Sequence, residues 1–153
     1  MRGTGSVTEG VPERADDVFA FLTDVDRLPE WNAIIADVVE RPDVVQRDAE
    51  WVVEIKAVGT SWKSRSKVEE YDPQQRVFAY RSCTDDGNPS YAIWRWQIEP
   101  DGDGASRVTV SWDVHPETFW RRVLLSRIRG RQLRREVPAS IAALARAMNG
   151  PTA

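Results

Sequence analysis

Three hydroxyl side chains interrupt stretches in which large apolar residues recur at every second position. Ser64 and Ser66 fall within residues 62–68, and Tyr80 falls within residues 76–84. Alternate residues of a strand point to the same face, so these hydroxyls would share a face with large apolar groups. A buried polar group needs a hydrogen-bond partner. The three hydroxyls therefore either bond to one another, to backbone or to water, or they orient the polar part of a bound molecule.

Side chains that could transfer a proton are scarce in this sequence. The single histidine, His115, has a side chain that titrates near neutral pH, but its parity with Asp113 predicts an outward, surface position. Asp37, Glu40 and Glu70 stand on expected strands, either at the rim of a pocket or simply in solvent. The sequence shows no positive sign of catalysis.

The sequence contains neither a metal-binding motif nor a phosphate-binding motif. With one histidine and one cysteine, Cys83, the chain lacks a zinc-type ligand cluster. It also lacks a glycine-rich phosphate loop. We therefore expect no metal and no cofactor. A single cysteine excludes an intrachain disulfide and fits a reducing compartment, so we expect a cytoplasmic protein.

Length and charge define the broad class. A chain of 153 residues can bury a real core, and we expect residues 1–153 to form a single domain. The net charge of −3 favours neither nucleic acid nor an anionic membrane as a partner. No segment approaches the roughly 20 apolar residues of a membrane span, so we expect no stable membrane insertion.

Seven stretches have the alternation or the β-branched composition of strands. They are residues 3–11, 34–41, 50–58, 62–69, 76–84, 91–99 and 107–114. Residues 85–89 (Asp-Asp-Gly-Asn-Pro) form the clearest loop between them. Strands joined by short turns predict an antiparallel meander with one buried face and one solvated face.

Two short helices are expected between the first two strands. Apolar residues at i, i+3, i+4 and i+7, from Ala15 to Leu22, form one stripe. Asp26 is a candidate cap for a second short helix that runs to Trp31. We expect these helices to close one end of the sheet.

From Glu117 onward the apolar residues recur with a helical period. Two apolar stripes, offset from each other around the helix axis, meet near Gly130. We expect a shorter helical segment before this glycine and the main helix after it. Pro138 is a site for a kink, because proline removes one intrahelical hydrogen bond.

The same C-terminal segment is rich in arginine. Eight arginines and two glutamates from Glu117 to the end give it a net charge of +6. This asymmetry is typical either of a surface that docks a partner or of the solvated side of a helix. Seven of the arginines lie close together, at Arg121, Arg122, Arg127, Arg129, Arg131, Arg134 and Arg135.

Residues 11–32 resemble the N-terminal signature of the START-like (SRPBCC, helix-grip) superfamily, which includes the Bet v 1 allergens and the polyketide cyclase/dehydrase families. The order of expected elements resembles this superfamily over nearly the whole chain. The resemblance implies an α+β helix-grip fold: a seven-stranded antiparallel curved sheet wrapped around a long C-terminal helix, with two short helices between strands 1 and 2. The residues that match the signature are Pro12, Val18, Phe19, Leu22, Asp24, Pro29 and Trp31.

In that superfamily the concave sheet face and the helix enclose a cavity for an apolar ligand. Large aromatic residues on such a face either contact a planar ligand or fill the core, and this chain has seven tryptophans. The helix would contribute Leu133, Val137, Ile141 and Leu144. The resemblance implies a lining from the strands of Trp51, Val53, Ile55, Trp62, Ser64, Ser66, Val68, Phe78, Tyr80, Trp94, Trp96, Val110 and Trp112.

Two functional hypotheses follow. The resemblance implies a protein that binds a hydrophobic small molecule, aromatic, polyketide-like or lipid-like. It also implies a cyclase or dehydrase activity in which the pocket shapes a reactive chain, with Tyr80, Ser64 and Ser66 as the orienting hydrogen-bonding groups. The alternative is a non-enzymatic interaction or regulatory module that docks a partner through the arginine-rich segment.

Overall fold

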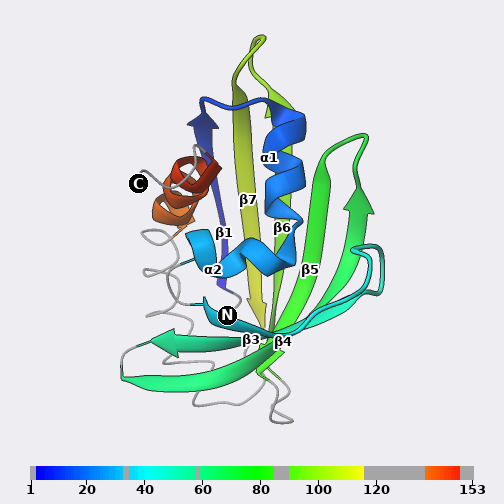
Figure 1. The fold of residues 1–153 in the computed structure, drawn as a ribbon, viewed down its shortest axis with the longest axis vertical. Helices are drawn as coiled ribbons and strands as arrows, with labels where there is room; N and C mark the ends of the chain where they lie inside the picture. The colour runs from blue at the N-terminus through cyan, green and yellow to red at the C-terminus, as the bar shows by residue number, and fades with distance from the viewer. Residues whose placement is uncertain (1–2, 33–34, 58, 85–89, 116–136, 149–153) are drawn as a thin grey trace.

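An antiparallel sheet of seven strands forms the body of the protein in a computed structural model, which describes residues 3–32, 35–57, 59–84, 90–115 and 137–148 (Figure 1). The sheet curves, and helices lie on one side of it (Figure 1). The predicted α+β fold with a curved antiparallel sheet is therefore confirmed. The strands are β1 (Gly3–Val11), β2 (Ile35–Glu40), β3 (Glu50–Ala57), β4 (Thr60–Asp72), β5 (Val77–Thr84), β6 (Tyr91–Pro100) and β7 (Ser106–His115).

Neighbouring strands in the sheet are neighbours in the chain, except at β1. The order β1-β7-β6-β5-β4-β3-β2 makes β2 to β7 a meander and pairs β1 with the last strand. The pairing runs from Gly3 opposite Val114 to Val11 opposite Ser106. Because β1 and β2 stand at opposite ends of this order, the chain that joins them must cross the whole sheet.

That crossing carries the predicted helices. The helices α1 (Ala15–Leu22) and α2 (Leu28–Trp31) are joined by a short 3-10 turn, η1 (Val25–Arg27). They lie over one face of the sheet (Figure 1). The hydroxyl of Thr23 donates a hydrogen bond to the Phe19 carbonyl at 2.9 Å, just past the end of α1. The two helices expected between the first two strands are confirmed.

The cap predicted at Asp26 is wrong. The residue before η1 is Asp24, which makes no side-chain cap hydrogen bond, and Asp26 lies inside the turn. The carboxylate of Asp26 instead forms an ion pair with Arg41, with Oδ1 and Nε 2.7 Å apart. The Asp26 carboxylate thus pairs with Arg41, directly after β2, and does not accept a hydrogen bond from a backbone N–H of the next helix.

The core lies between the helices and one face of the sheet, which we call the inner face and which carries Trp96 and Val110. Phe19 of α1 stacks on Tyr71 of β4, with ring centroids 5.7 Å apart. Trp31 of α2 meets Trp96 edge-on, also at 5.7 Å. Edge-to-face contacts of this kind add to the free energy of burial. They attach the crossing segment to the middle strands of the sheet.

Residues 137–148 form a helix (Figure 1). Val137, Ile141 and Leu144 belong to the same buried cluster as the inner face of the sheet. Their spacing is the one predicted for the second apolar stripe, so that part of the stripe is confirmed. Leu133 and the first predicted stripe lie outside the described residues. So does residue 134, which would be the hydrogen-bond partner that Pro138 cannot use, so the predicted kink stays a prediction.

Leu144 tests how firmly this helix is attached to the sheet. Its side chain is 0% exposed, so Leu144→Ala leaves a cavity and should lower the free energy of unfolding by about 2–5 kcal/mol. Urea denaturation followed by circular dichroism measures the change. Arg146→Ala, on the exposed side of the same helix, is the control and should change stability by less than about 0.5 kcal/mol. Equal effects of the two variants would contradict the packing.

Candidate functional site

The cross-strand register places the predicted strand residues on one face. Val137 and Ile141 approach the same core from the C-terminal helix. Whether these side chains contact a ligand stays a prediction. The inner-face residues of β3 to β7 include Trp51, Val53, Ile55, Trp62, Ser64, Ser66, Val68, Phe78, Tyr80, Trp94, Trp96, Val110 and Trp112.

Burial divides this set in two. Most members are buried, including Trp96 at 4% and Trp112 at 3% exposed. A smaller group is only partly buried and can touch another molecule without displacing the core. Its members are Ile55, Trp62, Tyr80 and Trp94.

Several aromatic residues of the set serve the core directly. Trp96 packs under Trp31 of α2. Trp51 stacks on Phe78, with ring centroids 5.9 Å apart, and meets Tyr80 edge-on at 5.0 Å. The interpretation as core filler therefore holds for the buried aromatic residues Trp51, Phe78 and Trp96. For the partly buried members, contact with a ligand stays a prediction.

A pair of serines forms a polar spot on the inner face. The Oγ atoms of Ser66 and Ser82 lie 2.6 Å apart across β4 and β5, and Ser66 is only 3% exposed. Ser64, on the same face, is 7% exposed. The sequence analysis missed Ser82, although it shares the parity of Tyr80. The Ser66 hydroxyl thus bonds within the protein.

Tyr80 is the titratable group near the centre of this face. Burial raises the pKa of its phenol to about 12, and the indole of Trp96 acts in the opposite direction. The Nε1 atom of Trp96 is itself buried with no hydrogen-bond partner among the described residues. The two groups are therefore close without forming a hydrogen bond of good geometry. At neutral pH the Tyr80 phenol is protonated and can donate a hydrogen bond, but it cannot accept a proton as a base.

The single histidine lies on the opposite, outer face. His115 stacks on Tyr91, with ring centroids 4.6 Å apart, and the Arg81 guanidinium lies 3.6 Å above the Tyr91 ring. The Nε2 atom of His115 is 2.7 Å from Oδ2 of Asp113. The predicted outward direction is correct, but the predicted surface exposure is wrong. The side chain is only 15% exposed, because Tyr91 covers one side of the ring.

The acidic candidates also point away from the inner face. Glu40 forms an ion pair with Arg65 at 3.1 Å, and Glu70 forms one with Arg95 at 3.6 Å. Asp37 stands opposite a residue of β3 that also faces outward. The rim of an inner pocket is thus the wrong interpretation for these three residues, and their charges are paired or solvated.

A β-bulge explains the position of Glu70. Simple alternation after Val68 would turn Glu70 inward, but the register shifts between these two residues, so that Glu70 stands opposite Ala79. An extra residue in one strand reverses the direction of the side chains that follow. Tyr71 consequently faces inward, where it contacts Phe19.

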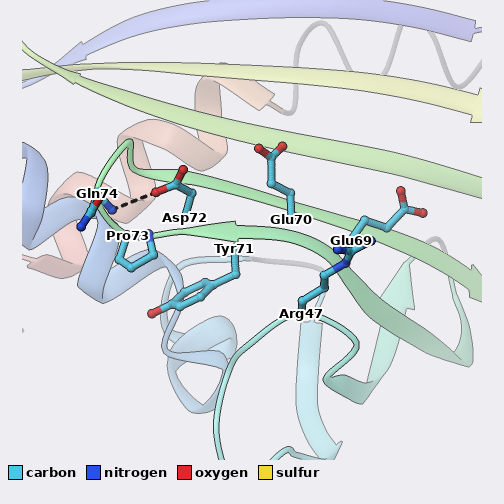
Figure 2. A pocket seen from close by; sticks show the side chains of 7 residues that line it. All are labelled: Arg47, Glu69, Glu70, Tyr71, Asp72, Pro73 and Gln74. Carbon is cyan, nitrogen blue, oxygen red and sulfur yellow. Dashed lines mark hydrogen bonds between the residues drawn. The ribbon is translucent and has the colours of Figure 1, made fainter.

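A surface depression of about 440 Å³ lies at the turn between β4 and β5 (Figure 2). Oδ1 of Asp72 accepts hydrogen bonds from the backbone N–H groups of Gln74 at 3.1 Å and Gln75 at 3.0 Å. This carboxylate therefore shapes the turn. The depression contains none of the predicted ligand contacts. Its lining residues are Arg47, Glu69, Glu70, Tyr71, Asp72, Pro73 and Gln74.

Among the described residues there is no group of three or more His, Cys, Asp or Glu side chains that could hold a metal ion. Within the same ranges, no helix is long and apolar enough to cross a membrane. The seven clustered arginines lie outside the described residues, between residues 116 and 136. Docking of a partner through that segment stays a prediction.

Comparison with known families completes the description. A family model for polyketide cyclase / dehydrase and lipid transport proteins matches residues 4–149. The chain belongs to this family. The START-like resemblance of residues 11–32 is thereby confirmed, and with it the helix-grip order of the elements. A search of curated protein sequences found no significant match.

Solved structures show the same fold at low sequence identity. The Zhui aromatase/cyclase from Streptomyces sp. R1128 is 18% identical, with a TM-score of 0.74 over 97% of this chain and 94% of that one. A START superfamily protein from Mycobacterium smegmatis is also 18% identical, with a TM-score of 0.72 over 95% of this chain and 97% of that one. Ara h 8.0201 is 15% identical, with a TM-score of 0.77 over 99% of this chain and all of that one (100%). These similarities establish the fold.

The Ser66–Ser82 pair predicts non-additive effects on stability. Ser66→Ala or Ser82→Ala alone leaves a hydroxyl without its partner and should lower the free energy of unfolding by about 1 kcal/mol. The double variant removes both hydroxyls and should cost less than the sum of the two single variants. Urea denaturation of the four proteins measures the coupling. Additive effects would contradict the hydrogen bond.

Tyr80 predicts a loss of stability at alkaline pH. An unfolded tyrosine titrates at about pH 10, whereas burial raises the pKa of Tyr80 in the folded protein to about 12. Between these values the unfolded state binds fewer protons. The contribution of Tyr80 is therefore complete below the lower value and is lost as the pH rises towards the higher one.

Tyr80→Phe should remove this component. Across the same interval the wild type should lose on the order of 2 kcal/mol more stability than the variant. Urea denaturation at several alkaline pH values gives both slopes. The difference between the two slopes removes the contribution of the other groups that titrate in the same range, because both proteins contain them. Parallel slopes would show that Tyr80 titrates as it does in the unfolded chain.

Proposed function

We propose that this protein binds a hydrophobic small molecule, aromatic, polyketide-like or lipid-like, between the inner face of the sheet and helix 137–148. The observation that carries the proposal is the partial exposure of four large side chains on an otherwise buried face. Uncovered apolar groups on a concave surface are typical of ligand sites. Membership of the polyketide cyclase / dehydrase and lipid transport family supports the same class of ligand. The four side chains are Ile55, Trp62, Tyr80 and Trp94.

The polar groups near these side chains favour a ligand that also carries oxygen atoms. The protonated phenol of Tyr80 is a donor, and the hydroxyl of Ser64 can donate or accept. A planar ligand with a carbonyl or hydroxyl group could stack on Trp94 while its oxygen bonds to one of these groups. A purely hydrocarbon ligand would leave them unpaired, which costs binding free energy.

A cyclase- or dehydrase-type reaction on this face would depend on positioning. The described inward-facing residues of β3 to β7 include Tyr71 and Tyr80 as titratable groups, but no histidine or carboxylate. Both phenols pack against aromatic rings, Tyr71 against Phe19 and Tyr80 against Trp51, and Tyr80 is the one that lies beside Trp94 in the sheet. The phenol would hold a substrate carbonyl, and Trp94 would fold the apolar chain against it. Holding reacting atoms together can supply a large part of catalysis.

Trp94→Ala tests the binding site. Trp94 and its neighbour Ile93 are both partly buried on β6 but point to opposite faces. Fluorescence titration with 1-hydroxypyrene should show saturable binding to the wild type. Trp94→Ala should weaken this binding about tenfold or more, because a stacked aromatic contact and its buried area are lost.

Ile93→Ala is the matched control and should bind the probe like the wild type. Equal losses in the two variants would indicate general destabilisation, which would contradict a site at Trp94. Native mass spectrometry of the purified wild type gives an independent test, because a co-purified ligand would appear as an added mass. Absence of both the added mass and saturable probe binding would overturn the proposal.

A further inference from the structure

Gly5 lies beneath one of the largest side chains of the inner face. It stands in β1, directly opposite Trp112 of β7. A Cβ atom added at Gly5 would lie 2.2 Å from Cζ2 and 2.4 Å from Cε2 of that indole. Non-bonded carbon atoms pack at about 3.5–4.0 Å. The indole therefore occupies the space that any other residue at position 5 would need.

This arrangement sets the direction in which the Trp112 ring leans. The ring rests over the backbone of β1, and it is only 3% exposed. On its other side stands Trp94, with ring centroids 6.2 Å apart and ring planes tilted by 43°. A side chain at position 5 would push the indole away from β1. The sheet lies below, so the ring would move towards Trp94 or up and away from the sheet.

We infer that Gly5 determines which ligands the inner face accepts, by letting Trp112 lie flat against β1 and leaving room above Trp94. The inference rests on the proposed function, because it concerns the space over the same partly buried tryptophan. The size of the largest ligand that fits would thus depend on Gly5, a residue without a side chain on the edge strand β1. Gly5 is thus a positioning residue and Trp112 is the group it positions.

The inference predicts an effect that depends on ligand size. Gly5→Ala should raise the dissociation constant of the four-ring probe 1-hydroxypyrene about tenfold or more, because an overpacked site repels the larger molecule. The two-ring probe 2-naphthol needs less room and should change by less than about twofold. Gly10→Ala, also on β1, is the matched control, since a Cβ there meets no atom within 4 Å. This control should bind both probes like the wild type.

A second substitution tests the mechanism. Trp112→Phe shortens the ring and removes Cζ2, the indole atom that the new Cβ would approach most closely. Gly5→Ala/Trp112→Phe should therefore bind 1-hydroxypyrene as Trp112→Phe does, which is the signature of a direct contact. If Gly5→Ala alone does not fold, judged by its thermal transition, the double variant is expected to fold and to carry the same comparison.

The outcomes separate this inference from the function on which it rests. A wild type that binds neither probe and carries no co-purified ligand overturns the proposed function. A wild type that binds both, together with a Gly5→Ala variant that retains 1-hydroxypyrene or loses both probes equally, overturns the role of Gly5 alone. A double variant that is unfolded, or that binds no better than Gly5→Ala, overturns it as well. Selective loss of the larger probe with rescue by Trp112→Phe supports it.

Discussion

The chain between β1 and β2 has to span the full width of the sheet, and much of the structure follows from this constraint. β1 pairs with β7 and β2 pairs with β3, so two consecutive strands stand at opposite ends of the strand order. The helices that make the crossing bury their apolar sides on the inner face, where Trp31 meets Trp96. One part of that face is thereby filled with protein. The part around Trp94 keeps partly uncovered aromatic surface, and this is where a ligand is proposed to bind.

Sequence periodicity predicted the strands and their faces because each depends mainly on adjacent residues. Trp94 and Trp96 alternate with Arg95, and this alternation alone identifies the buried side of β6. The same rule, continued past Val68, would turn Glu70 to the buried side, but a bulge in β4 adds a residue and reverses the faces. No local pattern in the sequence marks that bulge. It arises from how β4 pairs with β5, which a period of two residues cannot express.

The features that depend on distant partners could not be predicted in the same way. Asp26 pairs with Arg41 rather than with a nearby backbone N–H. Folding brings these two residues together, and a pattern of adjacent residues does not show it. The shielding of His115 comes from Tyr91 on the neighbouring strand. The contact between Gly5 and Trp112 joins the first strand to the last. A glycine in a strand has many possible causes, so the sequence around Gly5 does not reveal that the Trp112 ring lies over it.

The pairing of β1 with β7 also has a consequence for how the protein reaches its native state. β1 is made before the other six strands of the sheet, yet its hydrogen-bonding partner, β7, is the last of the seven to be made. Until then its backbone N–H and C=O groups have no native partner, and an unpaired strand edge is prone to join other chains. Closing contacts between such distant segments is slow, because the loop entropy is lost before the contacts are gained. The β1–β7 ladder can therefore form only after the other strands of the sheet have been made.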